Sequence, residues 1–291
     1  MSVVEGTLTG TLTMATPLLL GALGENIVER AGVVNVGLEG MMLLGAFAAT
    51  MGARQSGNPY LGVAVAAGIG VLTALLFAAF AIKLTANQVV IGVVMNLLAL
   101  GVTGTAYRAL FGTTGSFVET AALPRLLWDQ TLLTPLALLA VPAVWWGLFR
   151  TRLGLELRAC GEQPVAAEAA GVNVARLRTA ALAFGGAMAG IAGAFLSVGE
   201  TNTFKEDMTA GRGFIALAIV TAGRWNPYGC LAAALIFGFA DALQIRWQAL
   251  GWNLPYQLFL ALPYIVTLAI LALGGRASQA PAALGQPYRR A

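Results

Sequence analysis

The chain has 291 residues, of which 58% are hydrophobic and 10% are charged, and its mean hydropathy is +0.78. A soluble domain of this length needs more charge to cover its surface, so the composition excludes an ordinary soluble protein. The formal net charge of +4 comes from arginines beside apolar runs, without interleaved aromatic residues, and this argues against a nucleic-acid-binding surface.

Apolar runs follow one another from the N-terminus onward, and most reach the roughly 18–20 residues that cross a bilayer core. Long uncharged runs cover 6–24, 55–82, 84–107, 130–149, 179–199 and 247–275, and shorter ones cover 40–53, 213–223 and 225–240. The first ten residues lack the basic region of a secretory signal peptide, so we expect 7–24 to be a retained span. The pattern predicts an all-α, polytopic transmembrane bundle of about 8–10 spans.

Polar side chains at membrane depth are the first candidates for a substrate pathway, because such groups usually face the bundle interior. Asn35 and Glu39 are four residues apart and share one face if their segment is helical. Asn87 and Gln88 open the fourth span, and Asn96 lies two turns beyond Gln88. The alternative is that these groups only form interhelical hydrogen bonds.

Residues 150–178 form the one substantial charged segment between apolar runs, with five arginines and three glutamates. Within it, Pro164 and Gly171 delimit a predicted two-turn helix, PVAAEAA. Proline suits the first helical position, and glycine accepts the left-handed conformation just past a helix end. Such a short helix between two spans suits docking of a soluble partner; an idle surface loop is the alternative.

Arginines also predict the orientation of the chain. They concentrate in 150–178 and in the tail, at Arg276, Arg289 and Arg290, so the positive-inside rule places both segments in the cytoplasm. The loops 112–129 and 200–212 then lie outside, as does the N-terminus, which gives about nine crossings.

Two later segments bear on packing and on the pathway. GGAMAGIAGAF (185–195) places Gly186 and Gly190 in GxxxG spacing, which lets helix backbones approach closely. The eleven residues of 213–223 are too few to span a bilayer, at ~1.5 Å per residue. We expect either a short tilted span or a half-helix that lines a pathway.

Enzymatic function is not expected, and no catalytic or metal site is predicted. The chain has no histidine, and its two cysteines, Cys160 and Cys230, have no metal-binding or redox spacing. No G-x-x-x-x-G-K-[ST] loop occurs, so ATP binding through a Walker motif is excluded. Three functions remain: the membrane subunit of an ATP-driven importer, an autonomous secondary transporter or channel, and an anchor or scaffold.

Three segments resemble a known family: ENIVERAGVVNVGLEGMMLLGAF (25–47), GLELRACGEQPVAAEAAGVNVARLR (154–178) and GRGFIALAIVTAGRWNPYGCLAAALIFGFADALQ (211–244). They are similar to the permease subunits of ATP-binding cassette (ABC) importers in the ribose and branched-chain amino acid permease group. Within that group the resemblance is greatest to the smaller permease of bacterial nucleoside importers of the basic-membrane-protein type.

The resemblance implies a multi-pass protein of the bacterial cell membrane that carries nucleosides, or else simple sugars or branched-chain amino acids. It implies a second, unlike permease, a cytoplasmic ABC ATPase that binds ATP and Mg²⁺, and an external substrate-binding lipoprotein. No cofactor is expected in this chain, whose own contacts are membrane lipid and the small-molecule substrate.

The resemblance also assigns residues to the ATPase contact. The cytoplasmic helix becomes the coupling helix, flanked by Arg176 and Arg178 at the membrane surface, and the ATPase contact is expected at Arg158, Gly161, Glu162, Pro164, Ala167, Ala170 and Gly171. It assigns none to the substrate pathway, which we expect at the polar side chains at membrane depth, Asn35, Glu39, Asn87, Gln88 and Asn96. One permease domain would span 1–275, with the coupling loop at 150–178 and a short cytoplasmic tail at 276–291.

Overall fold

A computed structural model describes residues 3–112, 120–249 and 280–288. The described chain is helical, and its elements in order are α1 (Val3–Arg30), α2 (Leu38–Ser56), α3 (Pro59–Ala78) with the π-helical turn η1 (Ala79–Lys83), α4 (Gln88–Phe111), the 3₁₀ turn η2 (Leu127–Asp129), α5 (Leu133–Arg150), α6 (Arg152–Glu162), α7 (Pro164–Ala169), α8 (Val174–Ala194) with the π-helical turn η3 (Phe195–Thr201), α9 (Arg212–Ala222) and α10 (Pro227–Ala249).

Six stretches of the described residues are long and apolar enough to cross a membrane: Glu5–Arg30, Pro59–Lys83, Gln88–Phe111, Leu133–Arg150, Val174–Thr201 and Pro227–Arg246. The predicted polytopic helical bundle is therefore confirmed. The last predicted span, 247–275, falls almost wholly outside the described residues, so the predicted count of crossings stays a prediction.

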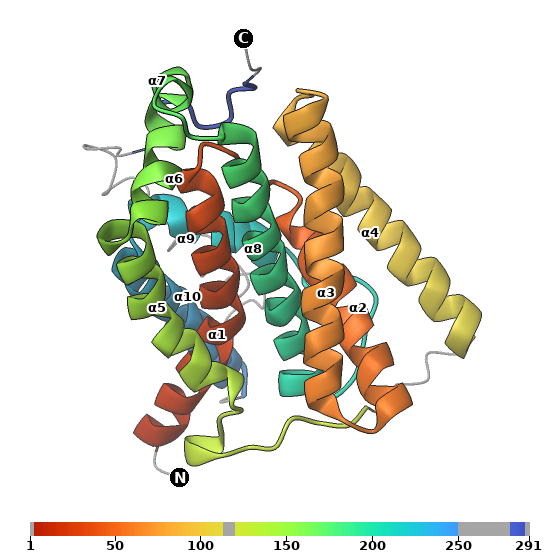
Figure 1. The fold of residues 1–291 in the computed structure, drawn as a ribbon. Coiled ribbons are helices and arrows are strands. Elements are labelled where there is room, and N and C mark those ends of the chain that lie inside the picture. The colour runs from red at the N-terminus through yellow and green to blue at the C-terminus, as the bar shows by residue number, and fades with distance from the viewer. Residues whose placement is uncertain (1–2, 113–119, 250–279, 289–291) are drawn as a thin grey trace.

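The helices α1 and α8 lie at the centre of the bundle, and α4 leans away at its edge (Figure 1). Outward side chains of α4 such as Val90 and Leu97 are 58% and 65% exposed, as expected where apolar surface faces lipid rather than water. The N-terminus lies at one end of the bundle, and α7 lies at the other together with residues 280–288 (Figure 1).

Glycines bring α8 against its neighbours, as the GxxxG spacing predicts. A Cβ on Gly190 would lie 2.1 Å from the carbonyl oxygen of Ala66, and one on Gly186 would lie 2.3 Å from that of Gly70, both in α3. On another side, a Cβ on Gly193 would lie 1.9 Å from the carbonyl oxygen of Met42 in α2. These approaches leave no room for side chains, so the glycines set the helix spacing.

The helix α9 is short, as both alternatives for 213–223 require, and its role in a pathway stays a prediction. It has only eleven residues, and its N-terminus contacts the first turn of α2 inside the bundle. In the preceding loop, whose predicted location outside the membrane stays a prediction, Glu206 is exposed and paired with Arg108 at the end of α4. However, Phe204 and Thr209 of that loop are fully buried, so the chain turns back into the bundle before α9 begins.

Candidate functional site

The short helix predicted between Pro164 and Gly171 is present as α7. Pro164 is the first residue of α7, and Gly171 adopts φ +88° just past its end. The amide of Gly171 donates to the carbonyl of Glu168 at 2.9 Å, and that of Val172 donates to the carbonyl of Ala167 at 3.0 Å. This pair of bonds is the Schellman arrangement, which closes the last turn and ends the helix sharply.

The predicted contact residues divide into a solvent-facing set and an inward set. Glu162, Ala170 and Gly171 are exposed, whereas Ala167 is buried against Cys160 and Val174. Pro164 and Arg158 are partly buried, and the guanidinium of Arg158 lies 5.0 Å from the ring centroid of Phe149. Sequence reasoning missed Val165, which is 71% exposed and is the one larger apolar side chain on α7.

Gly161 is placed for close packing rather than for an external contact. It is buried, and a Cβ there would lie 2.2 Å from the carbonyl oxygen of Arg30 and 3.2 Å from the amide nitrogen of Gly32. The end of α6 therefore rests directly on the turn that follows α1. Burial raises the pKa of the neighbouring Cys160 thiol, which keeps this cysteine neutral and unreactive.

The prediction that Arg178 flanks the coupling helix at the membrane surface is wrong. Arg178 is 3% exposed, whereas Arg176, two residues earlier, is exposed as predicted. The positive-inside rule predicts on which side of the membrane an arginine lies but not whether it is buried.

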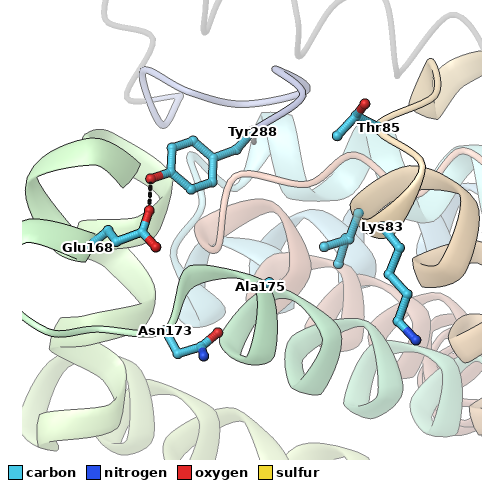
Figure 2. Close-up of a pocket in the computed structure, with 7 residues that line it drawn as sticks. Lys83, Thr85, Glu168, Asn173, Ala175 and Tyr288 are labelled. Atoms are coloured by element: carbon cyan, nitrogen blue, oxygen red, sulfur yellow. Dashed lines mark hydrogen bonds between the residues drawn. The ribbon is translucent and has the colours of Figure 1, made fainter. Parts of the chain in front are cut away.

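Residues 281–288, which we call the C-terminal strap, lie across this end of the bundle. The amide of Ala283 donates to the carbonyl of Gly161 at 2.9 Å, and that of Gly285 donates to the carbonyl of Gly32 at 3.2 Å. The hydroxyl of Tyr288 donates to the carboxylate of Glu168 in α7 (Figure 2). The strap was predicted only as a cytoplasmic tail, since nothing in its sequence indicates these contacts.

An open cleft of about 420 Å³ lies beside α7. Its walls come from the end of η1, the start of α8, α7 and the strap, and the side chains in Figure 2 are Ile82, Lys83, Thr85, Glu168, Asn173, Ala175 and Tyr288. This end of the bundle, called the docking end below after the predicted role of α7, therefore combines an exposed helix with an open recess of mixed polar and apolar lining.

Two of the predicted pathway residues, Gln88 and Asn96, hydrogen-bond to the segment Ala31–Gly37, which joins α1 to α2 without being helical. Asn35 belongs to this segment, so it does not share a helix face with Glu39, which lies in the first turn of α2. Asn35 and Glu39 were expected on one helix face only if their segment was helical, and it is not. Nevertheless, both side chains are buried, with exposed fractions of 0% and 8%.

Side chains satisfy the backbone of this segment. The amide of Val34 donates to Gln88 Oε1 at 2.8 Å, and the amide of Asn35 donates to Glu25 Oε1 at 2.9 Å. Asn96 accepts from the amide of Gly40 at 2.8 Å and donates to the carbonyl of Val36 at 3.0 Å. Irregular backbone inside a membrane protein is tolerated only where such partners exist.

Glu39 holds the N-terminus of α9. Its Oε1 accepts from the amide of Gly211 at 2.8 Å, and its Oε2 accepts from the amide of Gly213 at 2.6 Å. These amides have no partner within the helix, and the helix dipole favours a negative charge at this end. The N-termini of α2 and α9 therefore meet at one carboxylate.

Asn87 is separate from this cluster. It is exposed, and its side chain caps α4 by accepting from the amides of Val89 and Val90 at 3.0 and 3.2 Å. The structure thus brings together Asn35, Glu39, Gln88 and Asn96 but leaves Asn87 at the end of α4. In this conformation all of the predicted pathway residues except Asn35 make side-chain hydrogen bonds to backbone groups.

Sequence reasoning gave no role to the polar groups near the end of α1. Glu29, 4% exposed, accepts from the indole nitrogen of Trp225 at 2.5 Å, and Arg30 Nε donates to the carbonyl of Trp225 at 3.0 Å. Trp225 follows α9, so α9 is fixed at both ends. The spacing of Glu25 and Glu29, four residues apart on one helical face in an apolar span, was the available signal.

The chain matches the family described as the permease component of branched-chain amino acid transport systems, over residues 7–271. A Haloferax volcanii protein, provisionally named a glucose ABC transporter permease, is 37% identical over 100% of this chain and 99% of its own length. The guanosine ABC transporter permease NupQ of Bacillus subtilis is 36% identical over 96% of this chain and 94% of its own. The nucleoside ABC transporter permease NupC of Lactococcus lactis is 33% identical over 95% and 94%. No solved structure matches the chain.

Proposed function

Since the chain belongs to the family of permease components of branched-chain amino acid transport systems, we propose that it is the translocating subunit of an ATP-driven nucleoside importer. It is a multi-pass protein of the plasma membrane. The proposed role is transport without catalysis in this chain, with ATP and Mg²⁺ bound by a separate ATPase.

The observation that carries the proposal is the geometry of α7. It is a capped six-residue helix with an exposed face, held between α6 and α8 at the end of the bundle where the arginines gather. The sequence contains no Walker loop, and the proposal therefore assigns ATP to a separate ATPase that acts through α7. The proposed contact comprises Glu162, Val165, Ala170 and Gly171, with Arg158, Pro164, Gly161 and Ala167 supporting it from behind.

The proposed partners follow from this role. A cytoplasmic ABC ATPase would dock on α7, a second, unlike permease would complete the membrane part, and an external lipoprotein would deliver the substrate. The three relatives are named as ABC transporter permeases, which agrees with a subunit rather than a self-sufficient carrier.

The pathway is proposed to pass the junction of α2 and α9. Discontinuous helices whose N-termini meet inside a bundle present unpaired amides to a ligand. Here Glu39 occupies those amides, and Asn96, Gln88 and Asn35 lie around the same segment. A neutral ligand with hydroxyl groups could form hydrogen bonds with these side chains without leaving a charged group unpaired inside the bundle.

The substrate assignment rests on the relatives. Two of the three are named for guanosine or nucleosides, and one is provisionally named for glucose, so a simple sugar is the second candidate. Both substrates carry hydroxyl groups that suit amides and a carboxylate, and the polar cluster does not by itself separate them.

The test is uptake by vesicles that contain the whole transporter, purified with its ATPase, second permease and lipoprotein. Radiolabelled guanosine, glucose and leucine would be supplied separately, with ATP inside the vesicles. We expect ATP-dependent accumulation of guanosine. Accumulation of glucose alone would change the substrate assignment from nucleosides to simple sugars. Uptake by this chain without an ATPase would overturn the importer proposal.

A further inference from the structure

At the docking end one buried side chain, Arg178 in the second turn of α8, contacts the backbone of three separate segments. Its Nε donates to the carbonyl of Ala31 at 3.0 Å, its Nη2 to the carbonyl of Cys160 at 3.3 Å and its Nη1 to the carbonyl of Gln286 at 3.3 Å. One guanidinium therefore contacts the turn after α1, the end of α6 and the strap.

Arginine suits this position for a physical reason. The side chain is almost fully buried, and a buried charge is costly unless its donors are satisfied. A guanidinium has a rigid fork of donors that meets several carbonyls in fixed directions, whereas a lysine ammonium is a point charge on a flexible stem. The contact therefore fixes three backbone segments relative to one another.

The strap reinforces the same junction. The guanidinium of Arg178 lies 5.9 Å from the ring centroid of Tyr288, whose hydroxyl donates to Glu168 in α7 (Figure 2). The amide of Ala282 donates to Glu162 Oε2 at 3.2 Å, at the end of α6. The strap thus contacts both helices of the docking end and, through Gly285, the turn at Gly32.

The turn at Ala31 and Gly32 leads within four residues to Val34, Asn35 and Val36. The backbone of these residues is held by Gln88, Glu25 and Asn96. The end of α6 and the turn after α1 cannot shift far relative to each other, because Gly161 packs against Arg30 and Gly32 too closely for a Cβ. Packed contacts of this kind shift together rather than deform gradually.

We propose that Arg178, with the C-terminal strap, is the positioning element that transmits movement of α7 to the Ala31–Gly37 segment. This proposal rests on the proposed function. Arg178 belongs to neither the ATPase contact nor the substrate contact in this proposal. Loss of Arg178 therefore uncouples ATP hydrolysis from transport and leaves ATPase binding and substrate binding intact.

The experiment uses the whole transporter in vesicles and measures three quantities: ATPase retained on purification, ATP hydrolysed and guanosine accumulated. The variants are Arg178→Lys, Arg178→Gln and a deletion of residues 281–291. The matched control is Arg176→Gln, which removes an exposed arginine from the same helix turn. We expect the variants to retain the ATPase and hydrolyse ATP, while guanosine accumulated per ATP falls about 2- to 30-fold.

Two results would overturn the proposal: an unchanged ratio of uptake to hydrolysis, as in the control, or a fall in both quantities that matches a loss of bound ATPase. If Arg178→Gln does not reach the membrane, the strap deletion decides between these outcomes, because it leaves the arginine and every helix in place. Absence of ATP-driven uptake in the unmodified transporter would instead refute the proposed function.

Discussion

The carboxylate of Glu39 accepts the amide of Gly213 at 2.6 Å, which fixes the first turn of α2 to the first turn of α9. A Cβ on Gly213 would lie 2.6 Å from the Cα of Glu39, so the two backbones also touch. This junction joins the two discontinuous elements of the bundle, and the polar cluster is arranged around it.

We expect Glu39→Gln to weaken this junction. The amide side chain keeps one acceptor oxygen but loses the charge and the second acceptor, at a cost of about 2 kcal/mol. Uptake should fall and the thermal unfolding temperature in detergent should drop. Glu5→Gln, at an exposed position near the start of α1, is the control. Unchanged uptake and stability would show that the junction is unimportant.

Asn96→Ala should impair transport without weakening the docking of the ATPase. It leaves the amide of Gly40 and the carbonyl of Val36 without their side-chain partner, which costs about 1–3 kcal/mol. The measurements are guanosine uptake and the amount of ATPase that co-purifies. Thr105→Ala, at an exposed position of the same helix, serves as the comparison. Wild-type uptake by Asn96→Ala would remove Asn96 from the pathway.

The glycine contacts between α3 and α8 predict a large difference between two similar substitutions. Gly190→Ala places a methyl group 2.1 Å from the carbonyl oxygen of Ala66, so the helices must separate, at a cost of about 1–3 kcal/mol. Gly68→Ala, in α3, meets open space and should be tolerated. Thermal unfolding in detergent measures both. Equal stability of the two variants would contradict the packing described.

The exposed pair Arg108–Glu206 predicts a pH dependence confined to acid. The hydrogen bond from Arg108 lowers the pKa of Glu206 below its ordinary value. The contribution of this pair to stability is therefore present above the unfolded pKa, about 4.3, and is lost as the pH falls through the lower folded-state value. Glu206→Gln should match the unmodified protein at neutral pH in high salt, as measured by thermal unfolding. A clear loss there would mean that the pair is more than a screened surface contact.

Local sequence signals predicted the fold and the coupling helix. Pro164 and Gly171 act through their own backbone preferences, so the limits of α7 could be predicted from them alone. Likewise, GxxxG spacing predicted close packing of α8, although not that α3 is its partner. The apolar lengths predicted α1, α3, α4, α5 and α8, because a bilayer demands a minimum length, whereas α10 contains one of the shorter runs, 225–240.

The remaining features depend on contacts distant in sequence. Arg178 is buried among the carbonyls of Ala31, Cys160 and Gln286, which accept its hydrogen bonds. These residues are far apart in the sequence, so no sequence pattern indicates that they meet. The carboxylate of Glu39 accepts hydrogen bonds from the amides of Gly211 and Gly213, which are more than 170 residues away in the sequence. Asn35 was expected in a helix only conditionally, and the turn at Gly32, with φ +86°, ends α1 before it.

The central claim, that a separate ATPase drives this bundle through α7, is tested most directly by ATP-dependent guanosine uptake in vesicles carrying α7 variants. Val165→Glu places a charge on the exposed face, and Gly171→Pro cannot adopt φ +88°. Both should lose bound ATPase and ATP-driven uptake while the chain remains folded in the membrane, and Arg176→Gln should retain both. Undiminished ATP-driven uptake by Val165→Glu and Gly171→Pro would contradict the claim.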